Sequence, residues 1–161
     1  MERDLSREAR YERITEQLRG LLIATPSLMS AMATVCSLLH AKMRHHSWTG
    51  FYLVAGDELH VGPYQGPLAC QVLRGGGVCW EAVKMQKSVI VPDVQSFPGH
   101  IACDDRARSE VAVPLIRDRA VLGVLDVDSH APDQFDESDA RALERIVALL
   151  ALPSGLPRIV A

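Results

Sequence analysis

The sequence has no long hydrophobic run and little excess charge of either sign. No window approaches the roughly 18 uninterrupted apolar residues that identify a membrane-spanning helix. The charged N-terminal segment MERDLSREAR lacks the apolar centre of a secretory signal. The formal net charge is −3 and no basic patch stands out, so a nucleic-acid partner has little support. We therefore expect a cytoplasmic protein that binds neither membranes nor nucleic acid.

Cysteine never occurs as a C-x-x-C pair; the four cysteines are Cys36, Cys70, Cys79 and Cys103. This spacing does not match the paired ligands of structural zinc sites, and no metal is expected. A chain of 161 residues without a secretory signal is not expected to be a disulfide scaffold either. We assign Cys36 to the core, because it lies on an apolar helical stripe without polar neighbours.

The length suits a single domain over residues 1–161. A chain of this size can bury about 68–70% of its unfolded surface, so it needs no metal or disulfide to support its core. We expect the core to span about 10–152 and the tail, 153–161, to be loose. Nothing in the sequence divides the chain into repeats or separate domains.

Hydrophobic residues at helical spacing predict four helices. They are expected at 7–22, 26–46, 77–87 and 136–152. Thr25 is the predicted N-cap of the second helix, with Pro26 as its first residue. Asp136 is the predicted N-cap of the last. His45 and His46 are expected at the end of the second helix, where histidine favours the helix dipole.

Alternating segments predict strands, and turn residues predict where they stop. Two hairpins are expected at 48–64 and 109–129, and a short strand at 88–94. Long loops are expected at 62–77 and 94–108, and loops of that length are often functional. The element order predicts an α+β domain in which one antiparallel sheet carries helices packed on it.

Strand alternation predicts which side chains share a face of the sheet. In the segment 120–129, Asp126 and Asp128 lie on one face with Leu122 and Val124, opposite Val121, Leu125 and Val127. Pairing with the preceding strand brings Glu110 to the same face. Trp48 and Tyr52 also share a face of their own strand.

This pattern suggests a binding site. Three acids together are costly unless a cation neutralises them, and the ammonium group of a small ligand would do so. Trp48 and Tyr52 could hold an apolar or cationic end. A loop thiol, Cys103, lies among charged residues. His100, Arg106 or Arg108 could lower the pKa of Cys103 and favour the reactive thiolate.

Several motifs resemble those of the free methionine-(R)-sulfoxide reductases, single-domain proteins of the GAF fold. The motifs are WTGFYL, GPYQGPLAC, GGGVCWEAV, FPGHIACD, SEVAVPL and GVLDVDS. The resemblance covers about residues 10–152. It implies a GAF-like domain with helices on one face of an antiparallel sheet and a loop-covered pocket on the other.

The resemblance also implies roles for individual residues. Cys103 matches the nucleophile and Cys70 the resolving cysteine, and Cys79 matches a third cysteine with a redox role. Trp48 and Tyr52 match residues that pack on the methyl and sulfur end of the substrate. The matches to acids that hold the amino group and the sulfoxide oxygen are Glu110, Asp126 and Asp128. The implied substrate is free methionine (R)-sulfoxide, the implied reductant is thioredoxin with no bound cofactor, and a homodimer is suggested.

Two other interpretations remain open. The pocket could belong to a non-catalytic GAF sensor that binds an amino acid or nucleotide, with incidental cysteines. Alternatively, Cys79, His100 and Cys103 could bind zinc, although their spacing is unlike that of structural zinc sites.

Overall fold

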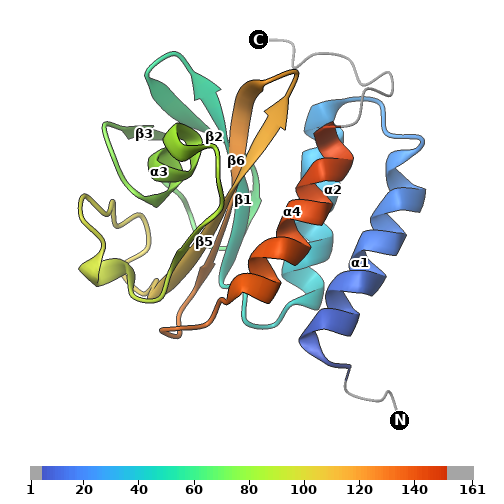
Figure 1. Ribbon diagram of the computed structural model, residues 1–161, viewed down its shortest axis with the longest axis horizontal. Coiled ribbons are helices and arrows are strands. Elements are labelled where there is room, and N and C mark those ends of the chain that lie inside the picture. Colours follow the sequence, from blue (N-terminus) through green and yellow to red (C-terminus); the bar gives the residue numbers. More distant parts are fainter. Residues whose placement is uncertain (1–4, 152–161) are drawn as a thin grey trace.

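The computed structural model describes residues 5–151, and the predicted loose tail lies outside them. A six-stranded antiparallel sheet has the strand order β3-β2-β1-β6-β5-β4. Two of the three long helices cover one face, the N-terminal helix packs on the outside of these two, and the short helix α3 and the loops lie on the other face (Figure 1). The elements are α1 (Arg7–Leu22), α2 (Leu28–Lys42), β1 (Trp48–Ala55), β2 (Glu58–Gln65), β3 (Val72–Arg74), α3 (Val78–Met85), β4 (Val89–Val91), η1 (Val94–Ser96), β5 (Ser109–Arg117), β6 (Ala120–Ser129) and α4 (Glu137–Ala151). The predicted α+β architecture is confirmed.

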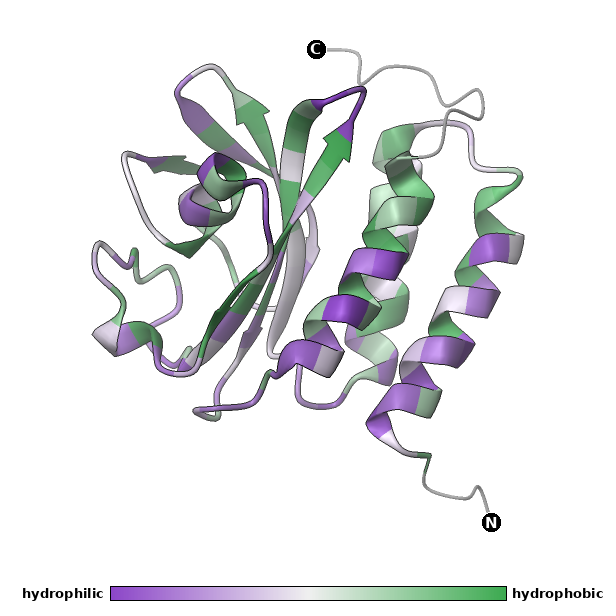
Figure 2. Cartoon of the chain, in the orientation of Figure 1, coloured by the Kyte–Doolittle hydropathy of each residue, from purple (hydrophilic) through white to green (hydrophobic). Residues whose placement is uncertain are grey.

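The main core lies between the sheet and the helices α2 and α4, and it extends to the inner side of α1. Figure 2 shows α2 as largely hydrophobic, whereas α1 and α4 are banded with hydrophilic residues on their outer sides. Buried residues such as Met32 of α2, Phe51 of β1 and Leu143 of α4 belong to this cluster. Cys36 is buried here as predicted, and its Sγ also lies 3.2 Å from the Pro63 carbonyl oxygen. Burial of this apolar layer fixes the sheet and leaves its other face for the site.

The second helix starts later than predicted. Ser27 is its N-cap, and the Ser27 hydroxyl accepts a hydrogen bond from Ser30 N at 3.1 Å. The predicted cap, Thr25, instead donates its hydroxyl to the Ser27 carbonyl oxygen at 3.3 Å. The Thr25–Pro26 prediction was therefore wrong, because Ser27 supplies an equally good cap two residues on. The prediction for Asp136 is confirmed, since its carboxylate accepts from the N–H groups of Ser138 and Asp139.

The two adjacent histidines lie beyond the second helix, which ends at Lys42. His46 is buried, and its ring nitrogens lie 3.2 Å from the Tyr11 hydroxyl and 3.4 Å from the Thr49 hydroxyl. Burial lowers the pKa of His45 to about 4, and burial also lowers the pKa of His46 well below its ordinary value. Both rings are neutral near pH 7, so the predicted interaction with the helix dipole was wrong.

The strands follow the predicted hairpins with two differences. The expected loop at 62–77 is interrupted, because β2 extends to Gln65 and the edge strand β3 pairs with it. In the second hairpin, Leu115 pairs with Gly123 and Ile116 with Val121, which leaves Leu122 as an extra residue. Leu122 packs against the helix-side core, contrary to its predicted face, because such a bulge reverses the alternation. Within residues 5–151, no helix combines the length and apolar character needed to cross a membrane.

Candidate active site

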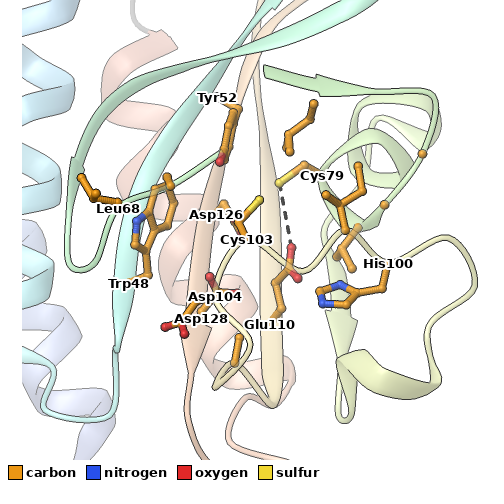
Figure 3. Close-up of a pocket in the computed structure, with 17 residues that line it drawn as sticks. Trp48, Tyr52, Leu68, Cys79, His100, Cys103, Asp104, Glu110, Asp126 and Asp128 are labelled. Atoms are coloured by element: carbon orange, nitrogen blue, oxygen red, sulfur yellow. Dashed lines mark hydrogen bonds between the residues drawn. The ribbon is translucent and has the colours of Figure 1, made fainter. Parts of the chain in front are cut away.

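A pocket lies on the sheet face opposite the long helices, between the strands, the start of α3 and the loop before β5 (Figure 3). It brings together almost every residue predicted for the site. Its lining residues are Trp48, Tyr52, Leu68, Ala69, Leu73, Gly76, Gly77, Val78, Cys79, His100, Ile101, Cys103, Asp104, Ala107, Glu110, Asp126 and Asp128. Cys70 is the one predicted site residue that does not line it, although its disulfide places it next to the wall.

The three acids converge as the strand pairing predicted. Glu110 of β5 pairs with Asp128 of β6, and Asp126, two residues earlier on β6, pairs with Ala112. Only 5% of Glu110 and 6% of Asp126 is exposed. Burial raises the pKa of Asp126 to about 6. Burial, together with the neighbouring carboxylates, raises the pKa values of Glu110 and Asp128 well above their ordinary range. At neutral pH the cluster therefore retains protons unless a cation enters.

The two predicted aromatic residues form one wall. The rings of Trp48 and Tyr52 are stacked with centroids 5.8 Å apart. Trp48 Nε1 donates to the Pro67 carbonyl oxygen at 3.2 Å, and the Tyr52 hydroxyl donates to the Cys70 carbonyl oxygen at 3.0 Å. These bonds tie the aromatic wall to the loop that carries Cys70.

A third aromatic residue supports this wall and was missed. Tyr64 also stacks on Trp48, with centroids 5.3 Å apart. Its partner in the strand pairing is Gly50, where a Cβ atom would overlap both the Trp48 ring and Tyr64. Tyr64 was predicted only as the last residue of the first hairpin, where that hairpin overlaps the expected loop at 62–77, and it was given no role in the site. The combination of glycine in one strand and tyrosine in the next was the signal that could have identified it.

Cys70 and Cys103 are joined by a disulfide bond, with their Cα atoms 5.3 Å apart. The bond connects the two long loops across 33 residues of sequence. Because Cys103 is in this disulfide, the alternative zinc set of Cys79, His100 and Cys103 is not available in this state. Two loop cysteines so close together can exchange between thiol and disulfide forms without a large rearrangement of the backbone.

The loop of Cys103 is anchored by the next residue, Asp104. Its carboxylate accepts hydrogen bonds from the N–H and Nε of Arg106 at 3.0 Å and lies 3.1 Å from His130 Nε2. These hydrogen bonds lower the pKa of Asp104 to about 2. Of the cations predicted to activate Cys103, Arg106 thus pairs with Asp104, and Arg108 Nε lies 3.8 Å from Asp93.

His100, the third predicted activating residue, does line the pocket. Burial lowers its pKa below the ordinary value, so it is neutral near pH 7. None of these three side chains is therefore a free cation that could lower the pKa of Cys103.

Cys79 lies at the start of α3 with its side chain in the pocket. Its Sγ is 3.9 Å from Glu110 Oε1 (Figure 3). Burial, with the neighbouring carboxylates, raises the pKa of Cys79 well above the ordinary thiol value. It is a protonated thiol, unlike a redox-active thiolate. The adjacent Trp80 does not line the pocket and donates Nε1 to the Leu73 carbonyl oxygen at 3.2 Å.

Comparison with known proteins defines the family. A model of the GAF domain matches residues 26–152. GAF domain-containing protein A of Dictyostelium discoideum is 42% identical over 147 residues, which are 90% of this chain and 92% of that protein. The free methionine-R-sulfoxide reductase of Escherichia coli (strain K12) is 36% identical over 141 residues, covering 87% of this chain and 86% of that protein.

A solved structure agrees with these sequence matches. The free methionine-R-sulfoxide reductase from Neisseria meningitidis, in complex with its substrate, aligns with a TM-score of 0.88 and 37% identity over 91% of this chain and 89% of that one. The family match and the structural similarity therefore identify a GAF domain. Within the GAF proteins, the chain belongs to the family of free methionine-(R)-sulfoxide reductases.

Proposed function

We propose that the protein reduces free methionine (R)-sulfoxide to methionine, with Cys103 as the nucleophile and Cys70 as the resolving cysteine. The observation that carries this proposal is one pocket lined by Cys103, three acids and two stacked aromatic rings. Membership of the reductase family supports it.

The acids account for a free amino acid as substrate. An ammonium group beside Glu110, Asp126 and Asp128 would compensate the charge that burial disfavours. The faces of Trp48 and Tyr52 would then receive the methyl and sulfur end. A peptide-bound methionine sulfoxide has no such ammonium group next to its side chain, so the pocket favours the free amino acid.

The first chemical step transfers oxygen. The Cys103 thiolate attacks the sulfoxide sulfur, and the oxygen takes up a proton and moves to the cysteine sulfur. The products are free methionine and a sulfenic acid on Cys103. Glu110 is the candidate proton donor, because its raised pKa keeps the carboxyl protonated at neutral pH. Asp126 is the alternative donor.

The second step regenerates the enzyme. The Cys70 thiol condenses with the Cys103 sulfenic acid, which releases water and forms the disulfide. A dithiol reductant of the thioredoxin type then reduces that bond to two thiols. Cys79 has no required part in this cycle, because its protonated thiol is a poor nucleophile. We further propose that the protein is a homodimer in the cytoplasm and carries no bound cofactor.

The test is the Cys103→Ser variant, assayed for methionine formation with excess dithiothreitol. We expect it to bind free methionine sulfoxide but to produce no methionine. The matched control is Cys36→Ser, which changes a thiol on the opposite side of the sheet and should remain active. Substantial methionine formation by Cys103→Ser contradicts the assignment. If wild type binds methionine sulfoxide without any turnover, the non-catalytic sensor is the correct interpretation.

A further inference from the structure

The proposed catalytic cycle leaves one feature of the pocket unused. Cys79 Sγ and single carboxylate oxygens of Glu110 and Asp126 all lie within 4.8 Å of one another. All three residues are buried. A buried thiol between two carboxylates is an unusual grouping, because each charged form disfavours the others.

A second observation indicates that one oxygen atom of this cluster lacks a binding partner. Asp126 Oδ1 is buried and has no hydrogen-bond partner among residues 5–151. The side chain lines the pocket, and only 6% of the residue is exposed. A buried carboxylate oxygen without a partner costs free energy, which a proton or a bound cation can offset.

The donor set indicates which cation would bind. One thiol and two carboxylates match the borderline-soft ions of the Zn²⁺ class, whereas Mg²⁺ and Ca²⁺ take oxygen ligands only. With Zn–S near 2.3 Å and Zn–O near 2.1 Å, ligand atoms on a tetrahedral ion are roughly 3.5 Å apart. The three atoms here need only a small inward movement to reach that spacing.

We propose that Cys79, Glu110 and Asp126 form a binding site for a Zn²⁺-class ion, and that the ion competes with the substrate. On binding, the thiol loses its proton to solvent and a metal–thiolate bond forms, so one proton is released per thiol ligand. Three protein ligands leave one position for a water molecule, as in catalytic zinc sites. The competition rests on the proposed function, because the substrate ammonium group and the metal ion would need the same carboxylates. Metal binding itself does not depend on the proposed function.

Binding is tested with Co²⁺ on oxidised protein, in which the disulfide keeps Cys70 and Cys103 from acting as ligands. We expect one Co²⁺ per chain and a thiolate-to-cobalt charge-transfer absorption, which Zn²⁺ abolishes by displacement. Cys79→Ser should remove the absorption, whereas Cys36→Ser should keep it. Glu110→Gln should weaken binding by about 10- to 100-fold. An absent band in the wild type, or a band that persists in Cys79→Ser, overturns the proposal.

Competition is tested on the Cys70→Ser/Cys103→Ser double variant, which keeps Cys79 and cannot turn over substrate. Free methionine sulfoxide should reduce the Co²⁺ band in a concentration-dependent manner, whereas its N-acetyl derivative should not. A band unchanged at methionine sulfoxide concentrations that saturate the variant refutes competition. Because the cobalt spectrum requires no turnover, failure of the metal site and failure of the reductase assignment give different results.

Discussion

Glu110 of β5 and Asp128 of β6 stand directly opposite each other in the antiparallel strand pair. Like charges in this position destabilise a sheet, and burial adds to the cost. The cost disappears when the carboxyls are protonated, which explains why their pKa values lie well above the ordinary range. The same property provides a proton donor and a site for a cationic ligand.

The acid cluster should make stability depend on pH. Asp126 has an ordinary pKa of 3.8, which burial raises to about 6. Its contribution to folding is complete below pH 4 and is lost as the pH rises through 6, because the unfolded chain ionises first. We therefore expect the free energy of unfolding of Asp126→Asn, measured in urea and taken relative to wild type, to rise by up to about 3 kcal/mol from pH 4 to pH 7.

The control for this experiment is Asp57→Asn, the same change at an exposed turn position between β1 and β2. Its difference from wild type should stay nearly constant over the same range. If Asp126→Asn shows no relative gain as the pH rises, the carboxyl is not held in its protonated form by the fold.

Cys70→Ser separates the two redox steps. We expect it to release about one methionine per site, because the sulfenic acid on Cys103 forms before the disulfide. Turnover with thioredoxin should then stop, and dithiothreitol should restore part of it. Peptide mapping of wild type after a single turnover should find the Cys70–Cys103 bond. If Cys79–Cys103 is the main bond and Cys70→Ser keeps full thioredoxin-linked activity, Cys79 is the resolving residue.

Gly50 holds the aromatic wall in place. A Cβ atom there would overlap the Trp48 ring and Tyr64, so Gly50→Ala should displace Trp48 and raise the KM for the substrate at least several-fold. Gly20→Ala, in α1, is the matched control, since its Cβ has nothing within 4 Å. The control should keep its KM and gain up to about 1 kcal/mol of stability. An unchanged KM for Gly50→Ala would show that Trp48 does not contact the substrate.

The ammonium group should decide which sulfoxides are accepted. We expect N-acetyl methionine sulfoxide and peptide-bound sulfoxide to have far lower kcat/KM than the free amino acid. Acetylation removes the cation and leaves the acids without a partner, which costs several kcal/mol. Steady-state kinetics on matched preparations measure this, and similar kcat/KM values for both forms contradict the arrangement of the pocket.

Local patterns predicted much of the fold and the site. Periodicity placed the helices and both hairpins, and alternation brought Glu110, Asp126 and Asp128 together, since pairing of adjacent strands is a local event. Leu122 was misplaced because a bulge depends on the turn geometry and leaves no signal in alternation. The edge strand β3 was missed because three residues with glycines nearby resemble a loop.

Tertiary context determined the remaining features. His45 and His46 have helix-end signatures, but packing against Tyr11 and Phe135 places them in a buried network. Arg106 and Arg108 were predicted to act on Cys103, and only the folded loop shows that Asp104 and Asp93 are their partners. Such ion pairs depend on side-chain positions that sequence spacing does not determine.

The reductase function is tested by NADPH consumption in the presence of thioredoxin, thioredoxin reductase and separated diastereomers of free L-methionine sulfoxide. We expect the (R)-sulfoxide to be reduced, with methionine formed in equal amount to the NADPH consumed, and the (S)-sulfoxide to be reduced slowly or not at all. Equal rates on the two diastereomers would contradict a stereospecific pocket. No consumption with either one would contradict the reductase function.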